Sequence, residues 1–299
     1  MKRVIVIALV AALVIALMPL VAVAKPDKDK PLPATNIELV KKVTLHGRPQ
    51  GGGKPSKYAA TGNLGDLCAG NKYAIVIGIS DYPGAENDLE YSDDDATEVY
   101  DALTTLYGYK STNVRLLIDM GASFDKIEEA ISDIRTKEAG GDEVVFFFSG
   151  HGARGLAMDN DKEKIDEAIV IHDGNQNGSL VYIWDGQLRE WFGSFNTTRI
   201  VFIFDTCLAG GMTDLNGSGR IINMATTEGG TAYEDDQWGN GQFTYYFVDE
   251  GMLQGNADKY DNLSGIVDVT VEEAFDYAKA NCVWQKPTIK DSFEGDLLL

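Results

Sequence analysis

Basic residues are scarce in this sequence: 26 Lys and Arg stand against 46 Asp and Glu, and the net charge is −20. A protein that binds a phosphate backbone needs the opposite sign, so we expect no nucleic-acid partner. Long apolar runs are equally scarce. The single run at residues 4–24 could supply one membrane span at most, which excludes a multi-pass membrane protein. Since 44% of the residues are hydrophobic and 24% are charged, the chain is neither wholly disordered nor collagenous.

The first 24 residues have the features of a secretory signal peptide. Lys2 and Arg3 precede the apolar run, and Ala22-Val23-Ala24 offers small residues to a peptidase just before Lys25. The alternative is an uncleaved membrane anchor, since 21 apolar residues are enough to span a bilayer. Both interpretations place the protein outside the cytoplasm, either secreted or held at a membrane by residues 4–24.

The next segment, residues 25–71, differs from the rest of the chain in charge and composition. Residues 25–72 carry nine Lys or Arg and four Asp or Glu, a net charge of +5, whereas residues 73–299 have a net charge of −27. The segment is rich in Lys, Pro and Gly and shows no sustained hydrophobic period, which indicates a linker or pro-segment. We therefore divide the chain into a signal peptide (1–24), a pro-segment or linker (25–71) and one globular body (72–299).

The body alternates between apolar strands and amphipathic helices. The sequence predicts strands at 73–79, 114–118, 144–148, 168–171 and 200–204, and helices at 93–107, 124–137 and 184–192. Continuous apolar strands that alternate with helices are typical of a mainly parallel sheet covered by helices on both faces. In such sheets the functional residues lie beyond the carboxyl ends of the strands.

A Cys–His pair at two of those strand ends is the main functional signal. His151 follows the strand 144–148 and Cys207 follows the strand 200–204, so we expect both side chains to face one crevice. Taken singly, a His or a Cys in such a place is more often structural. Together, a thiolate nucleophile and an imidazole that activates it predict covalent catalysis. The backbone N–H groups of Gly152 and Cys207 are placed to stabilise an oxyanion.

The motifs around these residues resemble those of the caspase-like cysteine peptidases, and metacaspases and their prokaryotic relatives in particular. The segments that carry the resemblance are Tyr73–Ile79 with Tyr82, Asp94-Asp95-Ala96, Ser149–Gly152, Asp205–Gly211, Gly239–Tyr246 and Gln285-Lys286-Pro287. They follow the family's order across residues 72–299. The Cys motif departs from the common Asp-Ala/Ser-Cys-His-Ser-Gly and reads Asp-Thr-Cys-Leu-Ala-Gly. Legumain- and clostripain-like peptidases share the His-Gly and Cys arrangement, so such a peptidase with another specificity is an alternative.

The resemblance implies both a fold and an activity. The expected fold class is α/β: a caspase-like three-layer α/β/α sandwich with a mainly parallel central sheet, and residues 72–299 form its catalytic domain. The expected activity is that of a cysteine endopeptidase that acts on peptides or proteins through Cys207 and His151. No cofactor is required for this chemistry, and Ca²⁺ is a possible activator because some metacaspases respond to it. A non-catalytic exported pseudo-peptidase that binds a partner is the non-enzymatic alternative, and the intact His151 and Cys207 argue against it.

The resemblance also implies a specificity. In metacaspases two Asp residues form an acidic pocket for the residue before the scissile bond, and the matching positions here are Asp95 and Asp205, with Ser92 and Ser149 alongside. Such a pocket favours Arg over Lys, because a guanidinium bonds a carboxylate bidentately, and it rejects Asp. A simpler interpretation is that Asp205 caps a turn and Asp95 a helix N-terminus.

The clustered acids allow a second class of enzyme. Asp93, Asp94, Asp95 and Asp205 could bind Mg²⁺ for phosphoryl chemistry in a parallel α/β fold. The sequence lacks a Gly-rich phosphate loop, which disfavours this hypothesis.

Two cysteines remain for structural roles. Cys68 precedes the first strand, and Cys282 precedes Gln285-Lys286-Pro287, which resembles the family's entry to its last strand. The two cysteines could therefore be neighbours and form a disulfide in an exported protein. Two unpaired thiols are the alternative.

Calcium could be bound by acidic residues in the body. Asp173–Gly178 matches the first half of an EF-hand loop, but its twelfth position is Trp184 and not Glu, so a plain polar turn is favoured. Other acids that could supply ligands are Asp93, Asp159, Asp161, Asp235 and Asp236.

The basic segment before the body could make the protein a zymogen. It offers Lys28, Lys30, Lys41, Lys42, Arg48, Lys54 and Lys57 to an acidic body. An enzyme that cuts after basic residues could remove this segment from itself or hold it in the cleft as an inhibitor. A solvated spacer is the alternative.

Overall fold

The computed structural model describes residues 29–299 apart from 47–56, 160–163, 176–177, 261–262 and 264–267. The expected signal peptide therefore lies outside the described residues. Among the helices of the described ranges, none is both long and apolar enough to cross a membrane.

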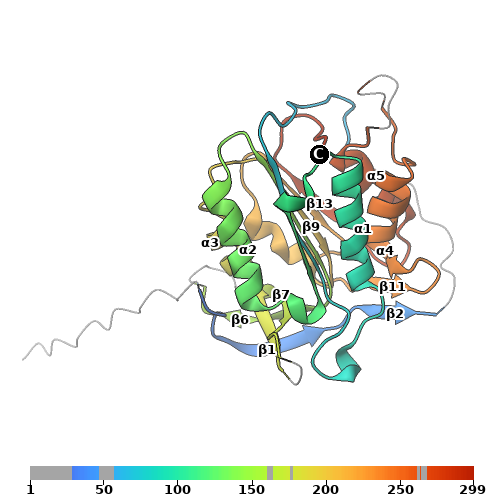
Figure 1. Cartoon of the computed structure of the whole chain (residues 1–299). Helices are drawn as coiled ribbons and strands as arrows, with labels where there is room; N and C mark the ends of the chain where they lie inside the picture. The colour runs from blue at the N-terminus through green and yellow to red at the C-terminus, as the bar shows by residue number, and fades with distance from the viewer. Residues whose placement is uncertain (1–28, 47–56, 160–163, 176–177, 261–262, 264–267) are drawn as a thin grey trace, which may run out of the picture.

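A six-stranded sheet forms the centre of the molecule (Figure 1). Its order is β13-β10-β9-β5-β3-β4, and its strands are β3 (Lys72–Gly78), β4 (Val114–Ile118), β5 (Glu143–Ser149), β9 (Ile200–Asp205), β10 (Arg220–Met224) and β13 (Thr288–Asp291). Neighbours pair in parallel except β10 and β13, which are antiparallel. Every residue of β5 and β9 is buried, because these central strands are covered on both faces, and this explains their apolar sequences.

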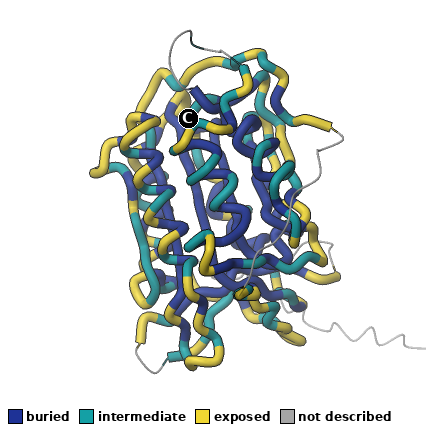
Figure 2. The backbone as a smooth tube through the Cα atoms, turned by 90° about the vertical axis from the view of Figure 1, so that its right-hand side faces the viewer, coloured by how far each residue is buried: buried dark blue, intermediate teal, exposed yellow. Residues whose placement is uncertain are grey.

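Helices cover both faces of this sheet, and alternate residues of β3 contribute to two separate cores. Ile75 and Ile77 pack in the core that contains side chains of α2 and α3, whereas Ala74 and Val76 pack in the core of α1, α4, α5 and a π-helix. The helices are α1 (Ser92–Thr105), α2 (Phe124–Lys137), α3 (Asp185–Phe192), α4 (Gln242–Thr244), the π-helix Tyr245–Leu253 and α5 (Val271–Asn281). Figure 2 shows the buried strands between helices that are exposed only on their outer sides. The expected three-layer α/β/α sandwich is confirmed.

Two smaller sheets complete the fold, and both include a strand from the N-terminal segment. One is antiparallel with the order β1-β6-β7-β8, and the other has the order β12-β11-β2. The strands are β1 (Ala34–Val40), β2 (Val43–Leu45), β6 (Gly152–Ala157), β7 (Asp166–His172), β8 (Leu180–Trp184), β11 (Tyr233–Asp235) and β12 (Asn240–Gly241). In Figure 1, β1 and β2 run in blue along the lower edge of the molecule.

The strands β1 and β2 lie within residues 25–71, where the sequence shows no sustained hydrophobic period and predicted no strand. Most of β1 is exposed, so its sequence needs no alternation of apolar and polar residues. Main-chain pairing with β6 holds it instead, from Ala34 opposite Ala157 to Val40 opposite Gly152. A strand fixed mainly by backbone hydrogen bonds leaves no hydrophobic period in the sequence.

Acidic side chains hold the described residues just before β3 against the body. Asp276 of α5 accepts hydrogen bonds from the backbone N–H groups of Ala59 and Ala60 at 2.7–3.0 Å. Asp296 accepts from the backbone of Thr61 and Gly62. These residues are therefore anchored through their backbone rather than through apolar side chains.

The proposed Cys68–Cys282 disulfide is not formed, and all three cysteines are free. The Sγ of Cys68 lies near the carbonyl oxygens of Asn71 and Gly141 at the amino end of β3, whereas the Sγ of Cys282 lies near the carbonyl oxygen of Gln242. The expectation assumed that the first and last strands start at the same edge of the sheet. It is wrong because β13 runs antiparallel to β10 and starts at the opposite edge.

Candidate active site

The carboxyl ends of β5 and β9 bring His151 and Cys207 to one edge of the sheet. Ser149 at the end of β5 pairs with Asp205 at the end of β9, and the N–H of Gly150 donates to the carbonyl oxygen of Asp205 at 3.3 Å. Gly152 lies so close to Cys207 that a Cβ there would collide with the Cys207 carbonyl oxygen. The two loops therefore meet directly after their strands, as the parallel sheet predicted.

Three contacts hold the imidazole of His151. Its ring stacks on Tyr82 with centroids 4.7 Å apart, and its Nε2 lies 2.7 Å from the carbonyl oxygen of Asn87. The Nδ1 accepts a hydrogen bond from the backbone N–H of Lys42 at 3.0 Å. Because an amide nitrogen only donates, the ring proton resides on Nε2 and the lone pair on Nδ1. Burial lowers the pKa of His151 to about 4, so the ring is neutral at pH 7.

The thiol of Cys207 is buried beside the same segment. Its Sγ accepts a hydrogen bond from the N–H of Ala232 at 3.2 Å, and the residue is 1% exposed. Burial raises the pKa of Cys207 to about 11, although the Ala232 N–H and the Lys42 ammonium oppose this shift. The next residue, Leu208, has a φ of 61°, a left-handed conformation that is costly for a residue with a side chain and that marks a tight turn at the nucleophile.

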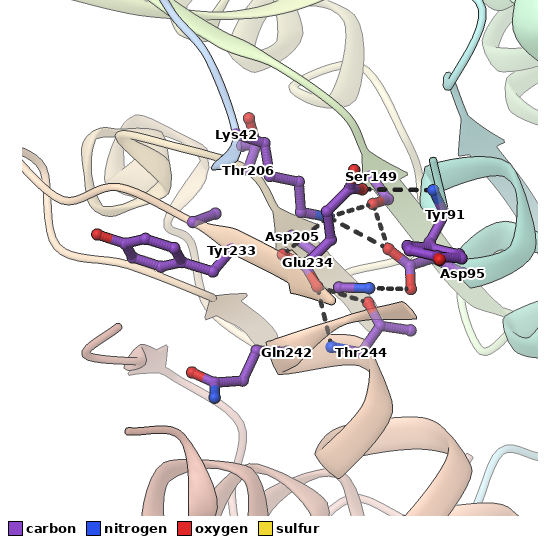
Figure 3. A network of polar contacts seen from close by, with 12 residues as sticks. Lys42, Tyr91, Asp95, Ser149, Asp205, Thr206, Tyr233, Glu234, Gln242 and Thr244 are labelled. Carbon is purple, nitrogen blue, oxygen red and sulfur yellow. Dashed lines mark hydrogen bonds and ion pairs between the residues drawn. The ribbon is translucent and has the colours of Figure 1, made fainter. Parts of the chain in front are cut away.

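An acidic pocket lies next to the pair, and a lysine of the N-terminal segment fills it (Figure 3). The Nζ of Lys42 lies 3.3 Å from Asp95 Oδ2, 3.3 Å from Asp205 Oδ1 and 2.9 Å from Ser149 Oγ. The side chains of Lys42, Asp95 and Asp205 are fully buried. The structure therefore brings together three of the four residues expected in the pocket and adds a cation that sequence analysis did not place there.

The two pocket carboxylates have further partners that fix their orientation. Asp95 accepts from Ser149 Oγ at 2.5 Å and from the N–H of Gly241 at 2.8 Å. Asp205 accepts from the N–H and the hydroxyl of Thr244 at 2.9 and 2.8 Å. The fourth expected residue, Ser92, is buried at the start of α1, but its Oγ has no hydrogen-bond partner among the described residues. The structure does not bring Ser92 into the group that contacts Lys42.

Burial and charge pairing act in opposite directions on Lys42 and on Asp95. Burial by itself lowers the pKa of Lys42, but Asp205 and Asp95 outweigh it, and the net effect raises the pKa of this ammonium. Burial raises the pKa of Asp95, Lys42 opposes this, and the nearby charge of Asp205 adds to it. The empty pocket would hold two buried carboxylates that repel each other, so a cation in it relieves an unfavourable arrangement.

Glu234 on β11 is a third acid near the pocket, and no sequence pattern predicted a role for it. Its Oε1 accepts from Thr44 Oγ1 at 2.7 Å and from the N–H of Glu90 at 2.8 Å, and Figure 3 shows it beside Lys42. Its charge contributes to the raised pKa of Lys42. Glu234 lies in a stretch of mixed polarity after the predicted strand 200–204, so no local pattern indicated that it lies near the pocket.

A separate acidic cluster could hold a metal ion. The carboxylates of Asp159, Asp166 and Asp185 each place an oxygen within 4.8 Å of the other two. Asp185 is fully buried, its Oδ2 has no hydrogen-bond partner among the described residues, and burial raises its pKa to about 9. A side chain at Gly186 would collide with the Asp159 carboxylate, so the cluster depends on a glycine there. Three hard oxygen donors suit Ca²⁺.

The other candidate calcium ligands do not join this cluster. Asp173 accepts from the N–H groups of Asn175 and Ser179 at 2.9 and 2.8 Å, as in a polar turn, while Gln176 and Asn177 lie outside the described residues. Of the remaining acids considered, only Asp159 belongs to the cluster; Asp161 lies outside the described residues, and Asp93, Asp235 and Asp236 lie elsewhere.

Comparison with known proteins identifies the family. The model of the caspase domain (Peptidase_C14) matches residues 71–293. Metacaspase-4 of Arabidopsis thaliana is 32% identical over 151 residues, which cover 48% of this chain and 34% of that protein. Metacaspase-1 of Saccharomyces cerevisiae is 27% identical over 175 residues, which cover 56% of this chain and 38% of that protein. The crystal structure of protein GSU0716 from Geobacter sulfurreducens has a TM-score of 0.50 at 15% identity, over 74% of this chain and 93% of that one, and shows a similar fold.

The chain therefore belongs to the caspase-domain peptidase family. The curated relatives it resembles are metacaspases, so the family resemblance inferred from the motifs is confirmed. The matched segment spans only about a third of the length of those relatives.

Proposed function

We propose that the protein is a cysteine endopeptidase that cleaves after basic residues, Arg before Lys. The observation that carries this proposal is the Lys42 ammonium in the acidic pocket, paired with both Asp95 and Asp205 next to His151 and Cys207. A pocket that buries a lysine side chain completely has the depth and the charge to take the basic residue of a substrate.

The geometry supports a covalent mechanism through Cys207 and His151. The Cys207 proton passes to His151 Nδ1, and Sγ attacks the carbonyl carbon of the residue whose side chain lies in the pocket. The C–N bond then breaks, and the leaving nitrogen takes the proton from Nδ1, which leaves a thioester. Water hydrolyses the thioester by the reverse proton path and regenerates the thiol. The N–H groups of Gly152 and Cys207 are the candidates for stabilising the tetrahedral oxyanion.

The specificity follows from the same pocket. A guanidinium offers five donors in a planar fork and can bond Asp205 and Asp95 together, whereas Lys42 reaches each of them at 3.3 Å as a point charge. A substrate aspartate would place a third carboxylate among two others and would be rejected.

We also propose that the protein is exported and stored with its N-terminal segment in the cleft. The apolar run at residues 4–24 supports export, and the placement of Lys42 supports a pro-segment that includes β1 and β2. Removal of this segment between Lys42 and Lys72 by the enzyme itself would release the pocket.

Calcium is proposed as an activator at Asp159, Asp166 and Asp185. The buried Asp185 Oδ2, which has no hydrogen-bond partner in the part of the chain that the structure describes, supports this site. Isothermal titration of the Cys207→Ala chain with CaCl₂ should show binding that Asp185→Asn weakens at least tenfold. Equal binding by the two chains would contradict the site.

A positional-scanning fluorogenic peptide library, run with and without Ca²⁺, tests the main proposal. We expect a profile led by Arg, then Lys, at the position before the scissile bond. A profile led by Asp or Asn would contradict the proposal and favour a caspase- or legumain-like specificity. A thiol-reactive peptide probe that fails to label Cys207 in the processed protein would favour a non-catalytic pseudo-peptidase.

A further inference from the structure

Resting on this proposed function, we propose that residues 40–45 occupy the cleft in the direction opposite to a substrate. In this arrangement Lys42 fills the pocket as an inhibitor, and a molecule cannot cut its own Lys42–Val43 bond. Removal of the segment then requires a second molecule. Four observations support the proposal: the atom bound to His151, the position of the Val43 nitrogen, the position of Lys41, and the strands on either side.

The chemistry fixes the direction in which a substrate must lie. The residue in the acidic pocket supplies the carbonyl that Cys207 attacks. The leaving nitrogen belongs to the residue after it and must take a proton from His151 Nδ1. The chain after the pocket residue therefore runs past His151, and the chain before it lies on the other side of the pocket.

In the structure, the backbone nitrogen next to His151 is not the one that would leave on cleavage after Lys42. The group that donates to Nδ1 at 3.0 Å is the N–H of Lys42 itself, the residue whose side chain fills the pocket. The nitrogen of Val43, which would have to leave on cleavage after Lys42, donates instead to the carbonyl oxygen of Ala232 at 3.0 Å. His151 therefore cannot protonate the leaving group of the Lys42–Val43 bond.

The preceding bond is also unsuited to cleavage. The nitrogen of the Lys41–Lys42 bond lies at His151, but the residue before this bond is Lys41, and its side chain is outside the pocket. The Nζ of Lys41 donates to the carbonyl oxygen of Glu86 at 2.6 Å, and the residue is exposed. Neither bond next to Lys42 combines a basic residue in the pocket with a leaving nitrogen at His151.

The flanking strands show the same direction. Before Lys42, β1 pairs with β6 up to Val40 opposite Gly152, the residue after His151. After Lys42, β2 pairs in parallel with β11, starting with Val43 opposite Tyr233. The chain before the pocket residue is thus on the His151 side, which is the reverse of a substrate. Turning the segment round within one molecule would break the hydrogen bonds of both strands.

The first test follows self-cleavage of the wild-type chain, made by cell-free translation and incubated over a wide range of dilutions. Intact mass and N-terminal sequencing report each cut. We expect processing of the wild-type chain to slow with dilution. The Cys207→Ala chain should not process itself, and added active enzyme should cut it. A first-order cut between Lys42 and Val43 whose rate does not change with dilution would overturn the inference.

The second test compares Lys42→Met with Lys41→Met, a matched change one residue away and outside the pocket. Iodoacetamide labelling of Cys207 and initial hydrolysis of an Arg peptide are measured before any cut appears. We expect Lys42→Met to raise both rates ~tenfold or more, because the competent open state becomes populated, and Lys41→Met to behave as wild type. Equal rates in wild type and Lys42→Met would overturn the inference. Circular dichroism shows whether each variant is folded, and the dilution test does not depend on either of them.

The two tests separate this inference from the proposed function. If Lys42→Met cleaves Arg peptides while the wild type cuts itself after Lys42 independently of dilution, the reversed direction is wrong and the proposed specificity stands. If Cys207 of Lys42→Met reacts readily with iodoacetamide, but a separate, unlabelled sample of the variant cleaves neither Arg nor Lys peptides, the proposed specificity is wrong and the inference is overturned with it.

Discussion

Three charged side chains are buried together in the acidic pocket, where the cation Lys42 pairs with two carboxylates. Lys42, Asp95 and Asp205 have fully buried side chains, and each would be costly to bury alone. Under the proposed function, the two carboxylates exchange the Lys42 ammonium for the basic residue of a substrate. At the residue scale, the pocket therefore binds a basic side chain, and in this structure that side chain belongs to the protein itself.

Asp205→Asn should weaken cleavage after Arg by about two to three orders of magnitude in kcat/KM, because a buried charge pair loses one partner. The amide keeps an oxygen for Thr244, so folding should be retained. The measurement is steady-state hydrolysis of an Arg fluorogenic peptide by processed enzyme. Asp94→Asn, an exposed acid on α1, is the matched control. A loss below threefold in Asp205→Asn would contradict the role of this carboxylate.

Cys207→Ala should abolish peptide hydrolysis, and His151→Ala should reduce it by several orders of magnitude, because nucleophile and base act as a unit. Cys68→Ser should retain full activity, since Cys68 is a free thiol at the other edge of the sheet. Peptide hydrolysis and non-reducing peptide mapping check these outcomes. Wild-type turnover in Cys207→Ala, or a mapped Cys68–Cys282 bridge, would show the assignment of these cysteines to be wrong.

At the element scale, the strongly apolar strands and the amphipathic helices were predictable, but the N-terminal strands were not. β5 and β9 are buried on both faces, and α2 has Ile127, Ile131 and Ile134 on its buried face, so their patterns report burial directly. β1 and β2 are held by backbone pairing with strands more than 100 residues away, which leaves no local pattern. Residues 59–62 are likewise held by side chains far away in the sequence, the carboxylates of Asp276 and Asp296.

Asp276→Ala should lower the free energy of unfolding by about 1–3 kcal/mol, because it leaves the N–H groups of Ala59 and Ala60 without their acceptor. Urea denaturation in the Cys207→Ala background, where no self-processing occurs, measures this change. Asp101→Ala, an exposed acid on α1, should change stability by less than about 0.5 kcal/mol. Equal effects of the two substitutions would rule out the clamp.

At the scale of the whole molecule, a net charge of −20 coexists with several buried carboxyl groups. Glu272 on α5 is fully buried, and its Oε2 accepts from the N–H of Leu297 at 2.8 Å, while its Oε1 has no hydrogen-bond partner within the described ranges. Burial raises the pKa of Glu272 to about 8 from its ordinary 4.5. The folded protein therefore binds a proton at this position that the unfolded chain releases above pH 4.5.

This linkage gives a pH dependence of stability with a definite sign. A raised pKa in the folded state contributes stability that is complete below pH 4.5 and is lost as pH rises toward about 8. Glu272→Gln should remove a slope that reaches about 1.4 kcal/mol per pH unit between pH 5 and 8, the value for one proton. Urea denaturation at several pH values in EDTA measures it, with the exposed Glu294→Gln as control. An unchanged slope in Glu272→Gln would show that this carboxyl is ionised in the folded protein.

The sequence by itself determined the layers of the fold and the placement of His151 and Cys207 at one edge of the sheet. Both follow from local patterns, since apolar strands predict a parallel sheet and parallel strands end at one edge. It also indicated Asp95, Asp205 and Ser149, through motifs that resemble those of the family. Only the tertiary structure decided that Lys42 fills the pocket and that Cys68 and Cys282 are far apart. It also decided the inferred direction of residues 40–45, which is opposite to that of a substrate. Those features depend on pairing between distant segments and on the direction of β13, and neither leaves a mark in the residues next to them.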